Sequence, residues 1–110
     1  MLPWMSEQEA GMGDDQQVHQ NAAESRFEIM IGTQTAGYVT YRDEPGVRVF
    51  LHAQVEPAFE GKGVGSRLAE GALKATREAG LRVEPQCDFI AVYIQRHQEH
   101  ADLVSQPPRH

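Results

Sequence analysis

A short run of glycines carries the clearest chemistry in this sequence. Three glycines take alternate positions in residues 60–66, which read Glu-Gly-Lys-Gly-Val-Gly-Ser. Glycine has no Cβ atom, so a ligand can approach the backbone N–H groups closely. The residues that follow predict a helix, whose first turn adds N–H groups without intrahelical acceptors and the positive end of the helix dipole. Together these features predict a phosphate-binding loop, formed by Gly61, Lys62, Gly63, Val64, Gly65 and Ser66.

The spacing of this loop differs from two common phosphate-binding patterns. The Walker pattern fails because no Lys-Ser or Lys-Thr pair follows a glycine at the required distance. The dinucleotide pattern GxGxxG, started at Gly61, fails because Ser66 takes the place of the last glycine. Spacing alone therefore leaves two interpretations open, a phosphate loop and a flexible glycine-rich connection.

Two further side chains have types suited to group transfer. Cys87 is expected just before a helix, where the helix dipole favours the thiolate, although cysteine is also a common small buried residue. His52 is expected on a strand, and it is a candidate base because an imidazole can accept and return a proton, the alternative being a structural or surface histidine. His97 and His100 stand three residues apart without a third ligand in the pattern, so no metal site is predicted.

The first elements that must position these residues are strands. Residues 26–31 and 36–42 alternate apolar and polar side chains on either side of a short turn, 32–35, which predicts an antiparallel hairpin. Strict alternation over 47–55 predicts a third strand with a single apolar face. That face would consist of Val47, Val49, Leu51, Ala53 and Val55.

Helical spacing replaces alternation after Pro57. Val64, Leu68 and Ala72 predict a long amphipathic helix that ends at Gly80. A short strand over 81–84 and a second helix, N-capped by Asp88, complete the pattern. Strand, helix and strand in succession predict a right-handed crossover between parallel strands. The fold class is therefore mixed α/β: an antiparallel hairpin is followed in the chain by a β-α-β crossover, and helices pack on a twisted sheet.

Composition limits the classes of protein to consider. The 110 residues are 40% hydrophobic and 24% charged, as in one soluble domain, and the net charge of −6 argues against binding to nucleic acid or to a membrane surface. The single cysteine makes no internal disulfide, and the start lacks a signal peptide, so a cytoplasmic protein is expected, as a monomer or weak dimer. We predict a disordered polar tail over 1–24, one domain over 25–105 and a frayed end over 106–110.

The glycine segment resembles the coenzyme A pyrophosphate loop of the GNAT N-acetyltransferase superfamily. That loop has a Gln or Arg, two further residues and then Gly-x-Gly or Gly-x-Ala before a long helix. Gly63 and Gly65 match it, and Glu60 stands at the Gln or Arg position. The sequence is more similar to a small single-domain subfamily, YjdJ-like or NATD-like, through residues 52–57, 60–68 and 85–90. The likeness covers nearly all of residues 26–104.

The resemblance implies a minimal GNAT-like fold with acetyl-CoA as the cofactor. It implies that Val55 and its neighbours pair with the pantetheine arm, and that the N–H groups of 61–66 hold the pyrophosphate. Lys62 and Arg67 would add positive charge beside the phosphates. Cys87 would carry the acetyl group or assist near the thioester, and His52 would be a second catalytic residue.

Three departures from the superfamily bear on catalysis. The turn 32–35 replaces one or two helices that help to shape the acceptor site, so the acceptor amine cannot be inferred. Gln95 stands where a tyrosine often acts as general acid, and Gln54 stands where the subfamily has a glutamate. We predict an acetyl-CoA-dependent N-acetyltransferase acting on an unidentified amine. The alternatives are a non-catalytic CoA- or acyl-CoA-binding module and a small protein-interaction domain.

Overall fold

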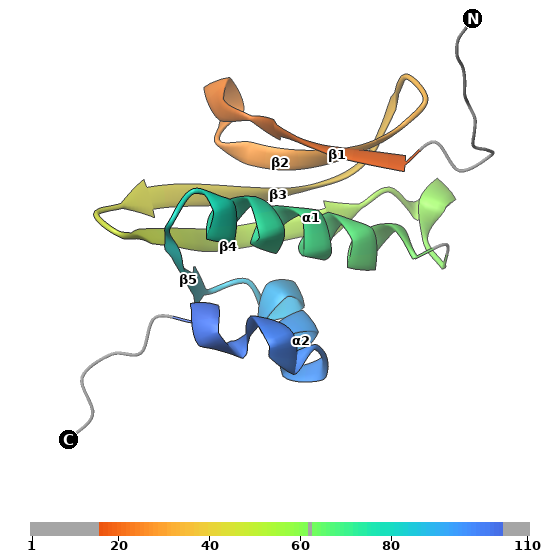
Figure 1. Ribbon diagram of the computed structural model, residues 1–110. Helices are drawn as coiled ribbons and strands as arrows, with labels where there is room; N and C mark the ends of the chain where they lie inside the picture. Colours follow the sequence, from red (N-terminus) through yellow and green to blue (C-terminus); the bar gives the residue numbers. More distant parts are fainter. Residues whose placement is uncertain (1–15, 62, 105–110) are drawn as a thin grey trace, which may run out of the picture.

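The computed structural model describes residues 16–61 and 63–104, which form one five-stranded sheet with helices packed on it (Figure 1). The strands follow one another across the sheet in chain order, β1-β2-β3-β4-β5. They are β1 (Gln16–Asn21), β2 (Arg26–Ile31), β3 (Gln34–Glu44), β4 (Val47–Val55) and β5 (Arg82–Pro85). The helices are α1 (Val64–Glu78) and α2 (Asp88–Arg96), with short 3₁₀ segments η2 (Ala22–Glu24), η3 (Pro57–Phe59) and η4 (Gln98–Leu103).

The predicted fold class is confirmed. Strands β2 and β3 form the antiparallel hairpin, β3 and β4 continue it, and β4 pairs with β5 in parallel after the α1 crossover. Helix α1 ends at Glu78 with Ala79 as its C-cap, and Gly80 follows at φ +77°, as a glycine that terminates a helix does. The N–H of Gly80 bonds to Arg77 O and that of Leu81 to Thr76 O, the two bonds of a Schellman motif.

The prediction of a disordered tail is wrong for residues 16–24, because 16–21 form β1 and 22–24 form η2. Strand β1 pairs antiparallel with β2, from Gln16 opposite Ile31 to Asn21 opposite Arg26. Its single apolar residue, Val18, packs against α1, and it gave no alternation to detect. The strand is held by its backbone pairing with β2 and by side-chain hydrogen bonds of His19 and Asn21 to Glu28 and of Gln20 to Tyr41. The predictions for residues 1–15 and 106–110 lie outside the described residues.

Strand β4 has the predicted bounds but lacks the predicted single apolar face. Thr40 pairs with His52 whereas Tyr41 pairs with Phe50, so Leu51 is an extra residue that forms a β-bulge. The bulge shifts the alternation by one position. Phe50 is therefore fully buried, whereas Leu51 is 37% exposed.

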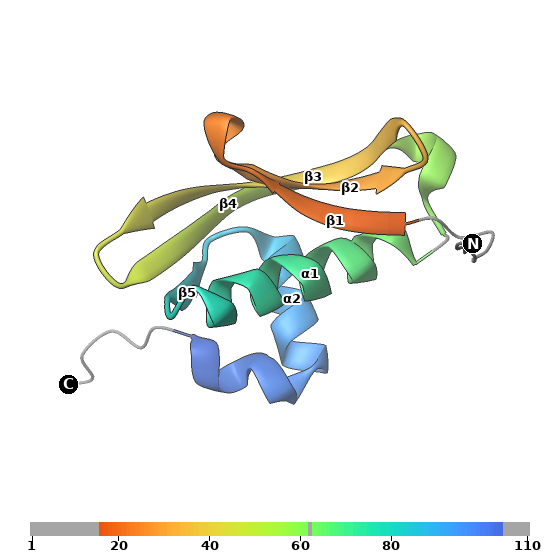
Figure 2. The same ribbon diagram turned by 45° about the horizontal axis from the view of Figure 1, so that its top comes forward.

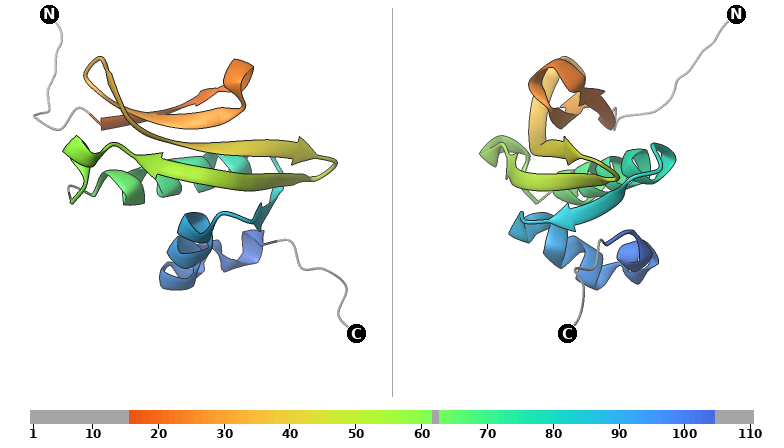
Figure 3. Two further views of the ribbon diagram at one scale, coloured as in Figure 1. Left: turned by 180° about the vertical axis from the view of Figure 1, so that it is seen from behind. Right: turned by 90° about the vertical axis from the view of Figure 1, so that its left-hand side faces the viewer.

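Both helices lie on the same side of the sheet (Figure 2). One apolar core fills the space between them and the strands, and the views from behind and from the end show the same layers (Figure 3). Burial of a side chain the size of Leu or Phe contributes about 1.5–3 kcal/mol. Fully buried members of this core include Phe27, Ile29, Val39, Phe50, Leu68, Leu73, Val83 and Ile90.

Two glycines allow the close packing of these layers. A Cβ atom at Gly71 of α1 would lie 2.8 Å from Val18 of β1, so only glycine lets the helix approach that strand. A Cβ atom at Gly65 would lie 2.9 Å from the Phe89 ring of α2. The glycines of α1 therefore set its distance to β1 on one side and to α2 on the other.

Candidate functional site

The glycine loop connects β4 to α1 through a backbone that requires glycine. Gly61 has φ +83° and Gly63 has φ +74°, both in the left-handed region. Gly63 is the N-cap of α1, and no side chain caps the helix there. The N–H groups of the first turn, from Val64 to Ser66, have no acceptor within the helix. The loop therefore presents main-chain donors at the positive end of the α1 dipole.

A cavity of about 420 Å³ lies on this loop. Its walls include the end of β4 at Val55, the first turn of α1, and the rings of Phe59 and Phe89. Of the predicted cofactor-binding residues it brings together Val55, Gly61, Gly63, Val64, Gly65 and Ser66. Lys62 lies outside the described residues. Arg67 lines a neighbouring cavity with Ser66, Glu70 and Tyr93 instead of this one.

A second cavity, of about 330 Å³, opens where β4 and β5 separate. The parallel ladder ends at Phe50 opposite Pro85, and Phe50 O accepts hydrogen bonds from the N–H groups of both Gln86 and Cys87. Beyond that point the chain turns into α2, and the strands no longer pair. The residues that line the opening are Leu51, His52, Ala53, Gln86, Cys87, Asp88 and Phe89.

The two predicted catalytic residues line this second cavity together. His52 follows the bulge of β4 and is exposed, with its ring 6.2 Å from that of Tyr38. Cys87 is buried and is the N-cap of α2, a place predicted for Asp88, which is instead the first residue of the helix. Cys87 takes the cap position because its backbone is extended (φ −84°, ψ 123°) where it bonds to Phe50 O.

Where the sequence differs from the superfamily pattern, the residues bond to partners outside the cavity of Cys87. Gln54 accepts a hydrogen bond of 3.3 Å from the Tyr38 hydroxyl. Gln95 is exposed, and its carbonyl accepts from the Gln98 side chain. Tyr93 is buried and donates to Glu70 Oε1 at 2.7 Å. Burial and this bond raise the pKa of the Tyr93 hydroxyl, and Tyr93 does not line the cavity of Cys87.

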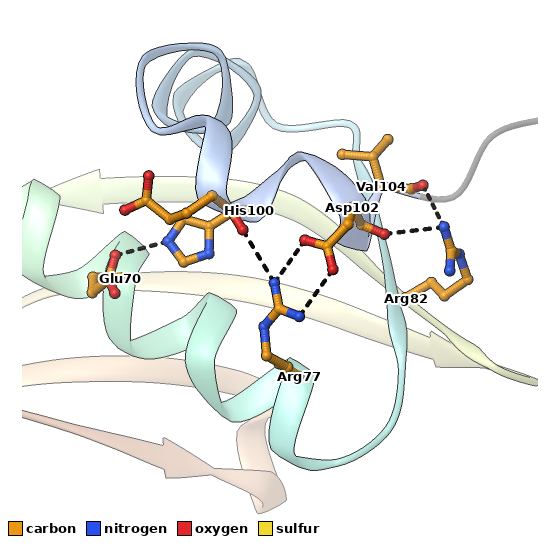
Figure 4. Close-up of polar contacts among 7 residues, drawn as sticks. Glu70, Arg77, Arg82, His100, Asp102 and Val104 are labelled. Carbon is orange, nitrogen blue, oxygen red and sulfur yellow. Dashed lines mark hydrogen bonds and ion pairs between the residues drawn. The ribbon is translucent and has the colours of Figure 1, made fainter.

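Polar contacts join α1 and β5 to η4 and Val104, and no pattern in the sequence predicted them (Figure 4). His100 Nε2 lies 2.8 Å from Glu70 Oε1, and hydrogen bonds from Tyr93 and then His100 hold the pKa of Glu70 below its ordinary value. Arg77 bonds to both carboxylate oxygens of Asp102, and Arg82 bonds to the carbonyls of Asp102 and Val104. These contacts fasten η4 to α1 and β5.

Donor atoms of Glu70, Glu99 and His100 lie within 4.8 Å of one another, a grouping that the pair His97 and His100 did not indicate. The Glu70 oxygen is already shared by Tyr93 and His100. His97 lies apart from the group, with its Nδ1 3.0 Å from Tyr93 O. The grouping thus serves the contact between α1, α2 and η4.

Phe89 is a residue of this region that sequence reasoning missed. Of the described residues, it alone lines both the glycine-loop cavity and the cavity of His52 and Cys87. Its position in the sequence was typical of a core residue on a helix. The close contact with Gly65, which fixes the ring at the junction, depends on the packing of α1 against α2.

Comparisons with known proteins bear on the family and on the fold. The sequence model of the GCN5-related N-acetyltransferase family matches residues 26–103. The fold is similar to that of a GCN5-like protein from Staphylococcus aureus solved by NMR, with a TM-score of 0.65 and 21% identity over 87% of this chain and 94% of that one. No curated protein matches the chain. Within the described residues, no helix is long and apolar enough to cross a bilayer. By the span of its match to the family's sequence pattern, the chain belongs to the GCN5-related N-acetyltransferases.

Proposed function

We propose that this protein transfers the acetyl group of acetyl-CoA to an amine. The observation that carries the proposal is the order of the two cavities along β4. Val55 lies in the glycine-loop cavity, and Leu51 and His52 line the cavity that also holds Cys87. A donor with phosphates at one end and a thioester at the other fits this order, since the strand runs directly between the two.

The glycine loop holds the diphosphate in this proposal. The first-turn N–H groups of α1 donate to its oxygens, and the helix dipole favours the negative charge. Among the residues that the structure describes, Arg67 lines the neighbouring cavity and Glu60 lines the loop cavity itself, so the donors assigned to the diphosphate here are main-chain N–H groups. Recognition by the main chain explains how a protein of net charge −6 binds a polyanion.

The chemistry takes place at the opening between β4 and β5. The amine nitrogen attacks the thioester carbonyl, the carbon–sulfur bond breaks, and the sulfur leaves with the bonding electron pair. The amine gives up a proton to His52, and the leaving sulfur takes up a proton from solvent, to which His52 then returns its own. The β-bulge at Leu51 removes backbone groups from the regular ladder, and an N–H there polarises the carbonyl oxygen. Cys87 assists at the thioester from the opposite wall.

A CoA titration followed by amide chemical shifts tests the binding half of this proposal. We expect saturable shifts at residues 61–66 and along the second half of β4, and smaller shifts in the turn between β3 and β4. Unchanged amides at 61–66 with saturating CoA would overturn it. An acetyl-CoA turnover assay with a panel of primary amines tests the catalytic half.

A CoA-binding module without activity is the second candidate. Two observations favour it: Gln54 cannot act as a base, and Tyr93 is bonded to Glu70 away from the cavity of Cys87. The same titration separates it from a protein-interaction domain, which would give no shifts. Binding without turnover across the amine panel would support it over the transferase.

A further inference from the structure

Phe89 stands at the junction of three cavities. Its ring lines the glycine-loop cavity, the His52 and Cys87 cavity, and a third of about 190 Å³ between α1 and α2. Among the described residues no other lines all three. The ring therefore lies between the glycine loop and Cys87, where a ligand that reaches from one to the other can contact it.

The Phe89 ring packs closely on Gly65 of α1, near Val55 of β4. The point where a Cβ atom of Gly65 would be lies 2.9 Å from Phe89 Cζ and 3.1 Å from its Cε1. The same point lies 3.6 Å from Val55 Cγ2 on β4. The ring is thus held where α1, α2 and β4 meet, and the missing side chain of Gly65 provides its space.

We propose that Phe89 is a positioning residue for the pantetheine arm, an inference that rests on the proposed function. The half-buried ring offers an apolar face to the arm between the two cavities, whereas the phosphates bind to main-chain donors of the loop. The ring then sets how far the thioester extends toward His52 and Cys87. Its contribution is to the arm alone and not to the diphosphate.

Two ligands distinguish binding of the pantetheine arm from binding of the diphosphate. Coenzyme A carries both the diphosphate and the arm, and adenosine 3′-phosphate 5′-diphosphate carries the diphosphate without the arm. We expect Phe89→Ala to weaken coenzyme A binding by about tenfold or more, as for loss of a large apolar contact, with binding of the fragment unchanged. Phe89→Leu keeps an apolar side chain and should restore most of the loss.

Phe59→Ala is the matched control, because Phe59 is also a half-buried aromatic residue but lines only the glycine-loop cavity among these three. It should leave the ratio of the two affinities as in the unaltered protein. Calorimetry measures both affinities, and thermal unfolding verifies that each variant is folded. If Phe89→Ala weakens both ligands equally, or neither, the positioning role is wrong. If the unaltered protein binds neither ligand, the proposed function itself fails.

Discussion

The Tyr93 hydroxyl donates a hydrogen bond of 2.7 Å to Glu70 Oε1, which joins the middle of α2 to the middle of α1. The same oxygen accepts from His100, so three segments of the chain meet at one carboxylate. The hydroxyl of Tyr93 on α2 is therefore used in a structural contact. The fold thus separates that residue from the cavity of Cys87.

Replacement of this tyrosine tests that separation. We expect Tyr93→Phe to lower the free energy of unfolding by about 1 kcal/mol, because one hydrogen bond is lost while the ring stays. Acetyl-CoA turnover should be unchanged, since the hydroxyl faces Glu70. Urea denaturation and the turnover assay measure the two effects. A large fall in turnover with unchanged stability would show that the hydroxyl takes part in catalysis.

The Glu70 carboxylate makes stability depend on acid pH. Its pKa is below 4.5 in the folded protein, so its contribution is complete above the unfolded value and is lost as the pH falls through the folded value. We expect the free energy of unfolding to fall on acidification below pH 4.5, and to fall less steeply in Glu70→Gln. Glu78→Gln, an exposed position on the same helix, should keep the original slope. Equal slopes in all three proteins would contradict the assignment.

The contact between Gly71 and Val18 predicts a non-additive pair of substitutions. Gly71→Ala should destabilise by about 1–3 kcal/mol, because its Cβ atom would lie 2.8 Å from Val18 and must push β1 away. Val18→Ala removes Cγ1 and Cγ2, two of the three atoms nearest to the new Cβ atom, and keeps the Cβ atom at 2.8 Å. The double variant should therefore lose less than the sum of the single losses, although part of the clash stays. Urea denaturation of the four proteins completes the cycle. Strict additivity would mean that β1 does not rest on α1 in solution.

Alanine substitutions at Gly63 and at Gly46 distinguish the cost of backbone strain from the loss of ligand binding. Gly63→Ala places an L-residue at φ +74° and should cost about 1–2 kcal/mol of stability and weaken CoA binding, because the loop donors shift. Gly46→Ala is the control: it has φ +76°, and it lies in the turn between β3 and β4, at the other end of β4 (Figure 1). It should lose similar stability and keep full CoA affinity. Equal affinity losses would remove the loop from the binding site.

Cys87→Ala tests the role of the thiol. The backbone bond from residue 87 to Phe50 O survives the change, so the backbone of the cavity wall stays in place while the thiol is removed. We expect turnover to fall by about a hundredfold or more while CoA affinity is unchanged. Turnover equal to that of the unaltered protein would make Cys87 a packing residue only.

The sequence was informative where local rules determine structure. Alternation located β2, β3 and β4, helical spacing located α1, and the glycines marked the loop before it, because each signal comes from neighbouring residues. Strand β1 was missed because it has one apolar residue and depends on β2 for its hydrogen bonds. The bulge at Leu51 was missed because it appears only in the register between two strands.

The candidate site was predicted in part for the same reason. The loop residues and Cys87 carry local signals, and the structure brings His52 and Cys87 to one cavity. Arg67 lies in another cavity and Phe89 lies at the junction because of how α1 and α2 pack. Residue spacing along one segment does not predict that packing. The bond from Tyr93 to Glu70 joins residues 23 positions apart and left no pattern in the sequence.

The strand order of the sheet has a consequence for how the chain reaches this fold. Each strand pairs with the strand next to it in the chain, and only the α1 crossover separates one pair by a long connection. Contacts between near neighbours in sequence require little loop-closure entropy before they form. The four antiparallel strands can therefore assemble by successive hairpins, and rapid refolding is expected, limited by the docking of β5 beside β4.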